Sequence, residues 1–174
     1  MRRKWALGLT LAATMVLGAC GQTIEEQATA GMSAAETTFE AQANDANTTF
    51  GQIKLYMPNG FAIEQGIDQA NYTLINKENM YILFVNVHEP TDSQLLYDIL
   101  KEDASKEIIG EDTFETDGVF GFSAITKASD ETSELIVSIG GVKLTTISKN
   151  KNLDSKLAEM MQIVQSVRVV EQAK

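Results

Sequence analysis

Two pairs of alternating apolar segments, each joined by two residues that favour a tight turn, constrain the fold of this 174-residue chain most strongly. The segments are residues 113–116 and 119–126 around Asp117-Gly118, and residues 135–139 and 142–147 around Gly140-Gly141. Glycine and aspartate accept the positive φ angles that two-residue hairpin turns require. The pattern therefore predicts two antiparallel hairpins.

Further strands are predicted nearer the N-terminus. Apolar residues alternate over 53–57, stop at the turn signal Pro58-Asn59-Gly60, and resume at 61–63. The segments 72–75 and 81–87 flank residues 76–79 and indicate another hairpin. Its second segment is apolar on both faces, which favours a central strand with Phe84 in the core.

Two helices are expected to cover the sheet. Thr91-Asp92-Ser93-Gln94 fits a capping box, and it is followed by apolar residues at helical spacing and by Gly110 near the expected end. Leu96 should lie on the buried face of this helix and Glu102 on its outer face. A second helix, capped by Asn152 or Asp154, should lead into a short closing strand over 166–170. Its apolar face comprises Leu157, Met160, Met161 and Val164.

The order of these elements resembles that of the PsbP-like α/β sandwich, a superfamily that includes the DcrB-like bacterial lipoproteins. The resemblance covers roughly residues 50–171 and rests on Met57-Pro58-Asn59-Gly60-Phe61, the hairpin ending at Val87, the helix after Pro90 and the run Ser166-Val167-Arg168. It implies an α+β fold with a single antiparallel sheet. It also implies a binding or assembly module, and it brings no catalytic residue with it.

The first twenty residues have the pattern of a secretory signal. A basic start at residues 2–4 precedes the apolar stretch Trp5 to Leu17, which is too short to span a bilayer. The run Leu17-Gly18-Ala19-Cys20 resembles the lipobox of bacterial lipoprotein signal peptides. This resemblance implies cleavage after Ala19 and attachment of a diacylglycerol, with acyl chains such as palmitate, to the Cys20 sulfur. The alternative is an ordinary secreted protein that keeps Cys20 as a free thiol.

These features divide the chain into three expected parts: a signal peptide over 1–19, the lipidated cysteine with an acidic flexible tether over 20–49, and the α/β domain over 50–174. A coil of this length would span about 30 Å. Two acyl chains would hold the protein firmly on the extracytoplasmic face of the cell membrane. Enteric bacteria retain lipoproteins in the inner membrane through an aspartate directly after the lipidated cysteine. This chain has Gly21 at that position, and a Gram-positive envelope is the expected location.

Charge limits the partners of the folded part. The chain has 14 basic and 24 acidic residues. Removal of residues 1–19 takes away three basic residues, so the rest carries a net charge of about −13. Such a charge repels phosphate groups, and neither nucleic acid nor a peripheral membrane surface is expected to bind the domain. Cys20 is the only cysteine, which excludes a disulfide within the chain.

Residues with catalytic or metal-binding chemistry are few. His88 is the only histidine, and with Glu89 it suggests either a proton-handling pair or a surface loop, the latter being the usual role of such a residue. Acidic residues gather at Glu111, Asp112, Glu115 and Asp117. On a strand Glu111 and Glu115 share one face and Asp112 lies on the other, so a solvated strand edge is the expected interpretation. Met160-Met161 suggests soft-metal binding or, more simply, core packing.

The sequence thus predicts no enzyme, no cofactor and no metal site. We expect a membrane-anchored envelope lipoprotein that binds a protein partner or assists assembly. The alternative is a carrier of a small ligand or cation in a cleft between sheet and helix.

Overall fold

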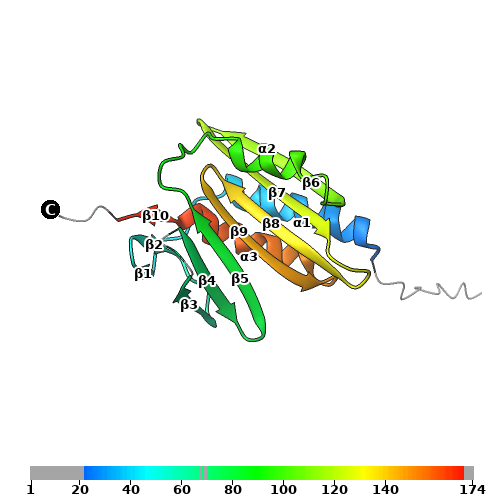
Figure 1. The fold of residues 1–174 in the computed structure, drawn as a ribbon, viewed down its shortest axis with the longest axis horizontal. Coiled ribbons are helices and arrows are strands. Elements are labelled where there is room, and N and C mark those ends of the chain that lie inside the picture. Colours follow the sequence, from blue (N-terminus) through cyan, green and yellow to red (C-terminus); the bar gives the residue numbers. More distant parts are fainter. Residues whose placement is uncertain (1–21, 67, 69, 171–174) are drawn as a thin grey trace, which may run out of the picture.

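The computed structural model describes residues 22–66, 68 and 70–170, and its centre is a seven-stranded antiparallel sheet in the order β3-β4-β5-β9-β8-β7-β6 (Figure 1). These strands are β3 (Phe61–Gln65), β4 (Asn71–Asn76), β5 (Asn79–Val85), β6 (Ile108–Thr116), β7 (Val119–Lys127), β8 (Thr132–Ile139) and β9 (Val142–Lys149). A second sheet, which was not predicted, has the order β1-β2-β10. Its strands are β1 (Thr48–Phe50), β2 (Ile53–Leu55) and β10 (Arg168–Val169). The predicted α+β class and antiparallel pairing are confirmed.

The predicted hairpin turns are confirmed. Asp117 and Gly118 join β6 to β7 with φ angles of 50° and 74°. Between β8 and β9 only Gly140 has a positive φ, 49°. Gly141 is needed for another reason, because a Cβ atom there would lie 2.5 Å from the Asn86 carbonyl oxygen. The second glycine therefore allows a close approach of two segments.

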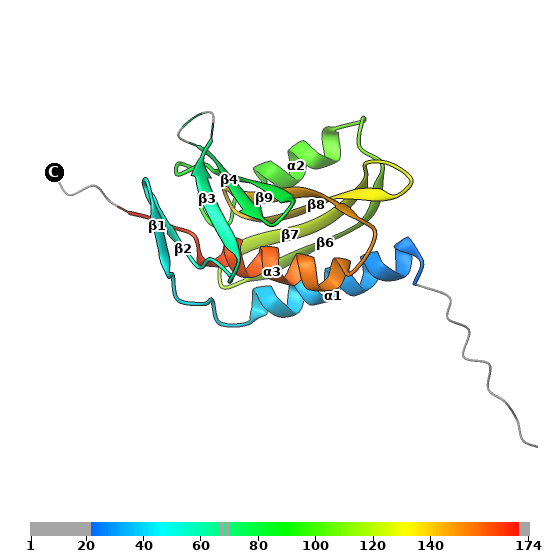
Figure 2. The same cartoon turned by 90° about the horizontal axis from the view of Figure 1, so that it is seen from below.

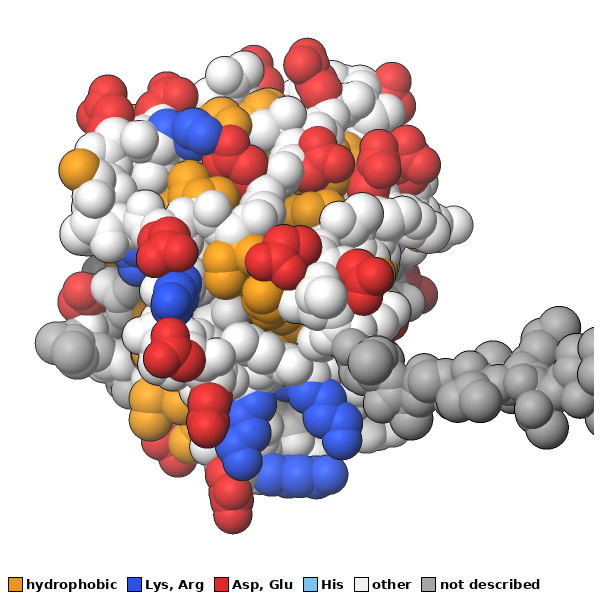
Figure 3. All heavy atoms as spheres, turned by 90° about the vertical axis from the view of Figure 1, so that its right-hand side faces the viewer, with side chains coloured by type: hydrophobic (Ala, Val, Ile, Leu, Met, Phe, Trp, Pro, Cys, Tyr) orange, Lys and Arg blue, Asp and Glu red, His pale blue; other side chains and the backbone are white. Residues whose placement is uncertain are grey.

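Helices α1 (Ile24–Glu40) and α3 (Leu153–Ser166) cover one face of the large sheet, and α2 (Leu95–Glu102) covers part of the other (Figure 2). The main core lies between the sheet and the two longer helices. Met160 and Met161 are fully buried there, so their role as core residues is confirmed. Both helices begin at the same end of the domain, the end that faces the viewer in Figure 3.

The flexible tether predicted over 20–49 is wrong for the part that the structure describes. Thr23 and Glu26 form a reciprocal capping box at the start of α1. The buried face of this helix is made mostly of small residues, and a Cβ on Gly31 would lie 2.7 Å from Leu157 Cδ1 of α3. The folded domain therefore begins at about Thr23 and not at residue 50. The signal peptide over 1–19 and Cys20 lie outside the described residues.

The predicted start of α2 is also wrong. The helix begins at Leu95, and Gln94 makes no side-chain cap. Thr91 instead joins the loop to the sheet, because its carbonyl accepts a hydrogen bond from Phe120 N at 2.9 Å. This bond holds residues 91–93 in a non-helical loop. The helix also ends early, at Glu102, and Gly110 lies within β6 beside a shift in register.

The predicted burial around α2 is partly confirmed. Leu96 is buried against Phe120 and Phe122, and Glu102 is exposed. Phe84 is only partly buried, so its placement in the core is wrong. It lies on the face of β5 opposite Leu83, and α2, of eight residues, is too short to cover that whole face.

Candidate functional site

An apolar cleft lies at the end of the domain where α1 and α3 end. It has a volume of about 510 Å³, which is within the range of ligand sites, about 300–1,000 Å³. Its walls come from the end of β5, the β6–β7 and β8–β9 turns, the segment after α1 and the start of β10. The apolar lining residues are Phe39, Ala43, Val85, Val87, Val119, Ile139, Val142, Val167 and Val169.

The Gly140-Gly141 turn positions one wall of this cleft. Asn86 N donates a hydrogen bond to the Gly141 carbonyl oxygen at 2.9 Å. A Cβ on Gly140 would lie 2.6 Å from the Pro90 carbonyl oxygen, and one on Gly141 would lie 2.6 Å from Glu89 Cβ. Side chains on this turn would therefore push the 86–91 loop away from the sheet.

Two polar side chains of the cleft, those of Gln165 and Arg168, form hydrogen bonds with the ends of the helices. The Gln165 side-chain amide donates to the carbonyl oxygens of Phe39 and Ala41, at 3.0 and 2.7 Å, and so caps α1. The Arg168 guanidinium donates to the carbonyl oxygens of Gln165 and Val167, at 2.8 and 2.7 Å. Most of the side chains that line the cleft are apolar.

Two apolar side chains of the cleft remain open to solvent. Val87 is 49% exposed and Val169 is 46% exposed. A ligand or partner that covered these side chains would remove their exposed area from water. This burial would contribute about 25 cal/mol per Å² to the free energy of binding.

The structure places the predicted pair, His88 and Glu89, in different surroundings. Glu89 lines the cleft and accepts a hydrogen bond from Ser93 Oγ at 2.6 Å. His88 is exposed, and its backbone N donates to Asn86 Oδ1 at 3.1 Å. Ser93 therefore pairs with the carboxylate and not with an imidazole.

The acidic residues around β6 do not converge. Glu111 pairs with Lys101 of α2, and it lies on the strand face opposite Asp112, as the alternation predicts. Burial, followed by the nearby Glu111 charge, raises the pKa of the Tyr97 hydroxyl. Asp117 is a turn residue. In the part of the chain that the structure describes, no three His, Cys, Asp or Glu residues are grouped as a metal site requires.

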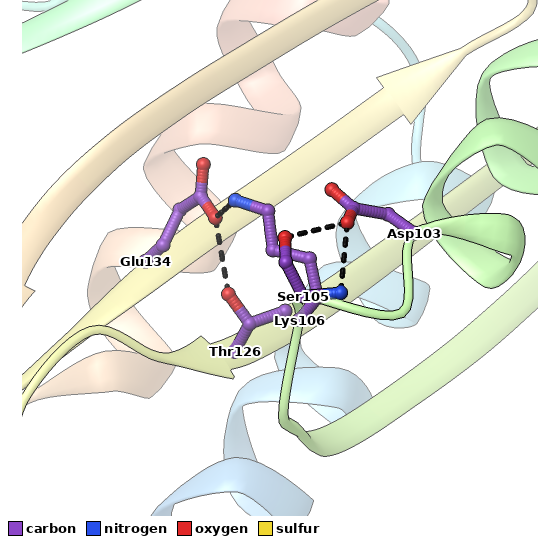
Figure 4. Close-up of polar contacts among 5 residues, drawn as sticks. All are labelled: Asp103, Ser105, Lys106, Thr126 and Glu134. Carbon is purple, nitrogen blue, oxygen red and sulfur yellow. Dashed lines mark hydrogen bonds and ion pairs between the residues drawn. The ribbon is translucent and has the colours of Figure 1, made fainter.

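A second polar cluster joins the segment after α2 to the sheet (Figure 4). Lys106 forms an ion pair with Glu134 of β8, whose Oε2 also accepts a hydrogen bond from Thr126 Oγ1 at 3.0 Å. The side chain and backbone N of Ser105 donate to Asp103 Oδ1. Because its charged side chains are engaged in this way, the cluster has a structural role.

Sequence reasoning missed one half-buried cation, Lys143 of β9. Its ammonium lies 6.0 Å from the centre of the Phe84 ring, and burial lowers its pKa. Its position between Val142 and Leu144 was the only signal in the sequence that this lysine would be partly buried.

No helix in the described part of the chain has the length and apolar character needed to cross a membrane.

Comparison with known proteins finds similarity among solved structures, where eight chains match. No family model and no curated protein matches the chain. Among solved structures, the solution structure of cyanobacterial PsbP (CyanoP) from Synechocystis sp. PCC 6803 matches with a TM-score of 0.44 and 11% sequence identity. The match covers 74% of this chain and 98% of that chain. At this level of similarity the match assigns no function and no site residue.

Proposed function

We propose that this protein is a lipid-anchored, extracytoplasmic binding module without catalytic activity, and that its cleft receives an apolar part of an envelope protein. The anchor is the Cys20 diacylglycerol expected from Leu17-Gly18-Ala19-Cys20. The observation that carries the binding role is the apolar cleft of about 510 Å³, in which Gln165 and Arg168 are engaged by the ends of the helices.

The open edge of the cleft favours a protein partner. Val87 and Val169 remain about half exposed where the cleft meets the surface. A partner side chain inserted between them would bury both and exclude water from the rest of the lining, which is the arrangement of an interface hot spot.

The size of the cleft also supports a second candidate function, transport of a small apolar ligand. Its volume matches that of common ligand sites, and most of its lining side chains are apolar. Such a ligand would remain bound to the protein during purification.

Site-specific photo-crosslinking in the native envelope tests the proposal. A photoreactive residue at Val87 is expected to capture one defined protein. The same residue at Ile147, which is 64% exposed and lies on the open face of the sheet, serves as the control and should capture none. Val169→Asp places a charge in the cleft and should abolish the Val87 adduct.

Two other results would contradict the protein-binding function. An apolar molecule of constant mass, retained by the purified protein and lost in Val169→Asp, would favour the carrier. Adducts of equal yield at Val87 and Ile147 would show that the cleft has no particular partner.

A further inference from the structure

The position of α1 restricts the distance between the domain and the expected anchor. Cys20 precedes Thr23, the cap of α1, by three residues. An extended chain rises at most about 3.6 Å per residue, so the two Cα atoms are at most about 11 Å apart. A lipid on Cys20 would therefore hold the start of α1 beside the headgroups.

The end of the domain held there, which we name the anchor pole, comprises the start of α1, the 149–151 loop and the start of α3. The loop is fixed in place through Asn150. Its carbonyl accepts a hydrogen bond from Gln27 Nε2 of α1 at 3.1 Å, and its Oδ1 accepts one from Ser133 Oγ of β8 at 2.7 Å. The loop thus has a defined position beside the first turns of α1.

Lysines are concentrated on this loop. Lys149 and Lys151 are exposed, and neither takes part in the ion pairs found within the described residues. The Lys156 ammonium donates to the carbonyl oxygens of Lys151 and Lys149, at 2.9 and 3.5 Å, and so stabilises the loop. Figure 3 shows Lys and Arg side chains grouped at the lower edge of this end of the molecule and Asp and Glu side chains over much of the rest.

The net charge of the chain gives this group an orienting effect. A chain near −13 from Cys20 onward is repelled by anionic lipid as a whole. The lipid anchor keeps the domain at the bilayer despite this repulsion. The charge distribution can then change only the orientation of the domain. The acidic residues at or beside the anchor pole are Glu25, Glu26, Glu107, Asp130, Glu131 and Asp154, and Asp130 forms an ion pair with Lys127. The two exposed lysines oppose their repulsion there.

We propose that the anchor pole faces the headgroups of an anionic bilayer, with Lys149 and Lys151 at the lipid phosphates, and that the cleft is held at the opposite end of the domain. This orientation rests on the anchor of the proposed function. α1 has 17 residues and is about 25 Å long. Because Phe39, near its end, lines the cleft, the cleft would open toward envelope proteins and away from the membrane.

Tryptophan fluorescence on vesicles tests this orientation. The only tryptophan is Trp5, so the chain that starts at Cys20 has none. That chain is coupled through Cys20 to a maleimide lipid in phosphatidylcholine vesicles, with or without phosphatidylglycerol. Ser155→Trp reports on the anchor pole and Val87→Trp on the cleft, and a spin label on lipid headgroups quenches a nearby indole.

We expect strong quenching for Ser155→Trp and none for Val87→Trp on vesicles that contain phosphatidylglycerol. Each lysine near an anionic surface favours this orientation about fivefold, so loss of both positive charges lowers its population about 25-fold. Lys149→Glu with Lys151→Glu also adds two negative charges, and it should therefore lower the population by more than about 25-fold and weaken the Ser155→Trp quenching. Lys54→Glu, in β2 at the cleft end, is the control and should change nothing.

Two results would overturn the proposal: quenching of Val87→Trp as strong as that of Ser155→Trp, or a Ser155→Trp signal that does not depend on the two lysines. Because the lipid is attached chemically, these results are independent of lipidation in the cell and of binding in the cleft. The vesicle assay can therefore fail while the proposed function holds, and the crosslinking assay can fail while the proposed orientation holds.

Discussion

Truncation of Phe39 to alanine tests whether α1 is part of the domain. The Phe39 side chain is 95% buried, since its exposed fraction is 5%, and its ring centre lies 5.5 Å from that of Phe114. Burial of a phenylalanine contributes about 2 to 3 kcal/mol to the free energy of unfolding, and an aromatic pair adds about 0.5 to 1 kcal/mol. Phe39→Ala should therefore cost about 3 kcal/mol, a large share of the stability of a domain.

Urea unfolding of the chain from Cys20 measures this cost, with Glu36→Ala as the matched control. Glu36 lies on the exposed face of the same helix, and its removal should change the free energy of unfolding by less than about 0.5 kcal/mol. Equal midpoints for the two variants would refute the reasoning, because a tether without packing loses nothing when Phe39 is shortened.

The remaining predictions concern other parts of the fold and can be checked in the same assay. Leu96→Ala should lower the free energy of unfolding by about 2 to 4 kcal/mol, whereas Glu102→Ala should change it by less than about 0.5 kcal/mol; equal effects would show that α2 does not pack on the sheet. Gly140→Ala should cost more than Gly118→Ala by at least about 1 kcal/mol, because both glycines have a positive φ but only the Gly140 Cβ would meet other atoms, at 2.6 Å. Burial raises the pKa of the Glu159 carboxyl, so its stabilising effect is complete below the unfolded pKa and is lost as pH rises through the folded pKa. Glu159→Gln should accordingly raise the unfolding midpoint at neutral pH and leave it unchanged below the ordinary carboxyl pKa.

The sheet could be predicted from the sequence because its signals are local. Period-two apolar runs and the Asp117-Gly118 turn determine hairpins without reference to the rest of the chain. The same is true of α3, whose large apolar residues Leu157, Met160 and Met161 recur at helical spacing.

Helix α1 could not be predicted in this way, because small residues form much of its buried face. Ala28, Gly31 and Ala35 give little apolar signal, yet they allow the close approach of α1 to α3. The start of α2 was misplaced for a different reason. Thr91 and Ser93 have the residue types of a capping box but bond to β7 and to Glu89 instead.

The cleft depends on tertiary contacts that no local pattern contains. Its walls combine Phe39, Val87, Val119 and Val167, which lie far apart in the chain. Among the candidate residues singled out from the sequence, only Glu89 lines it. Gln165 and Arg168, which also line the cleft, were absent from that set because their side chains bond to carbonyl oxygens at helix ends, and no local pattern indicates this.

Analysis of the N-terminal peptide of the protein in its own envelope tests the central claim most directly, because both the proposed function and the orientation depend on the anchor. Mass spectrometry should find a chain that begins at Cys20 and carries a diacylglyceryl group, recovered in the membrane fraction. Cys20→Ala should be found in the soluble fraction and should unfold at the same urea concentration as the parent chain without its lipid. An unmodified Cys20 in the parent, or recovery of Cys20→Ala with the membranes, would contradict the account.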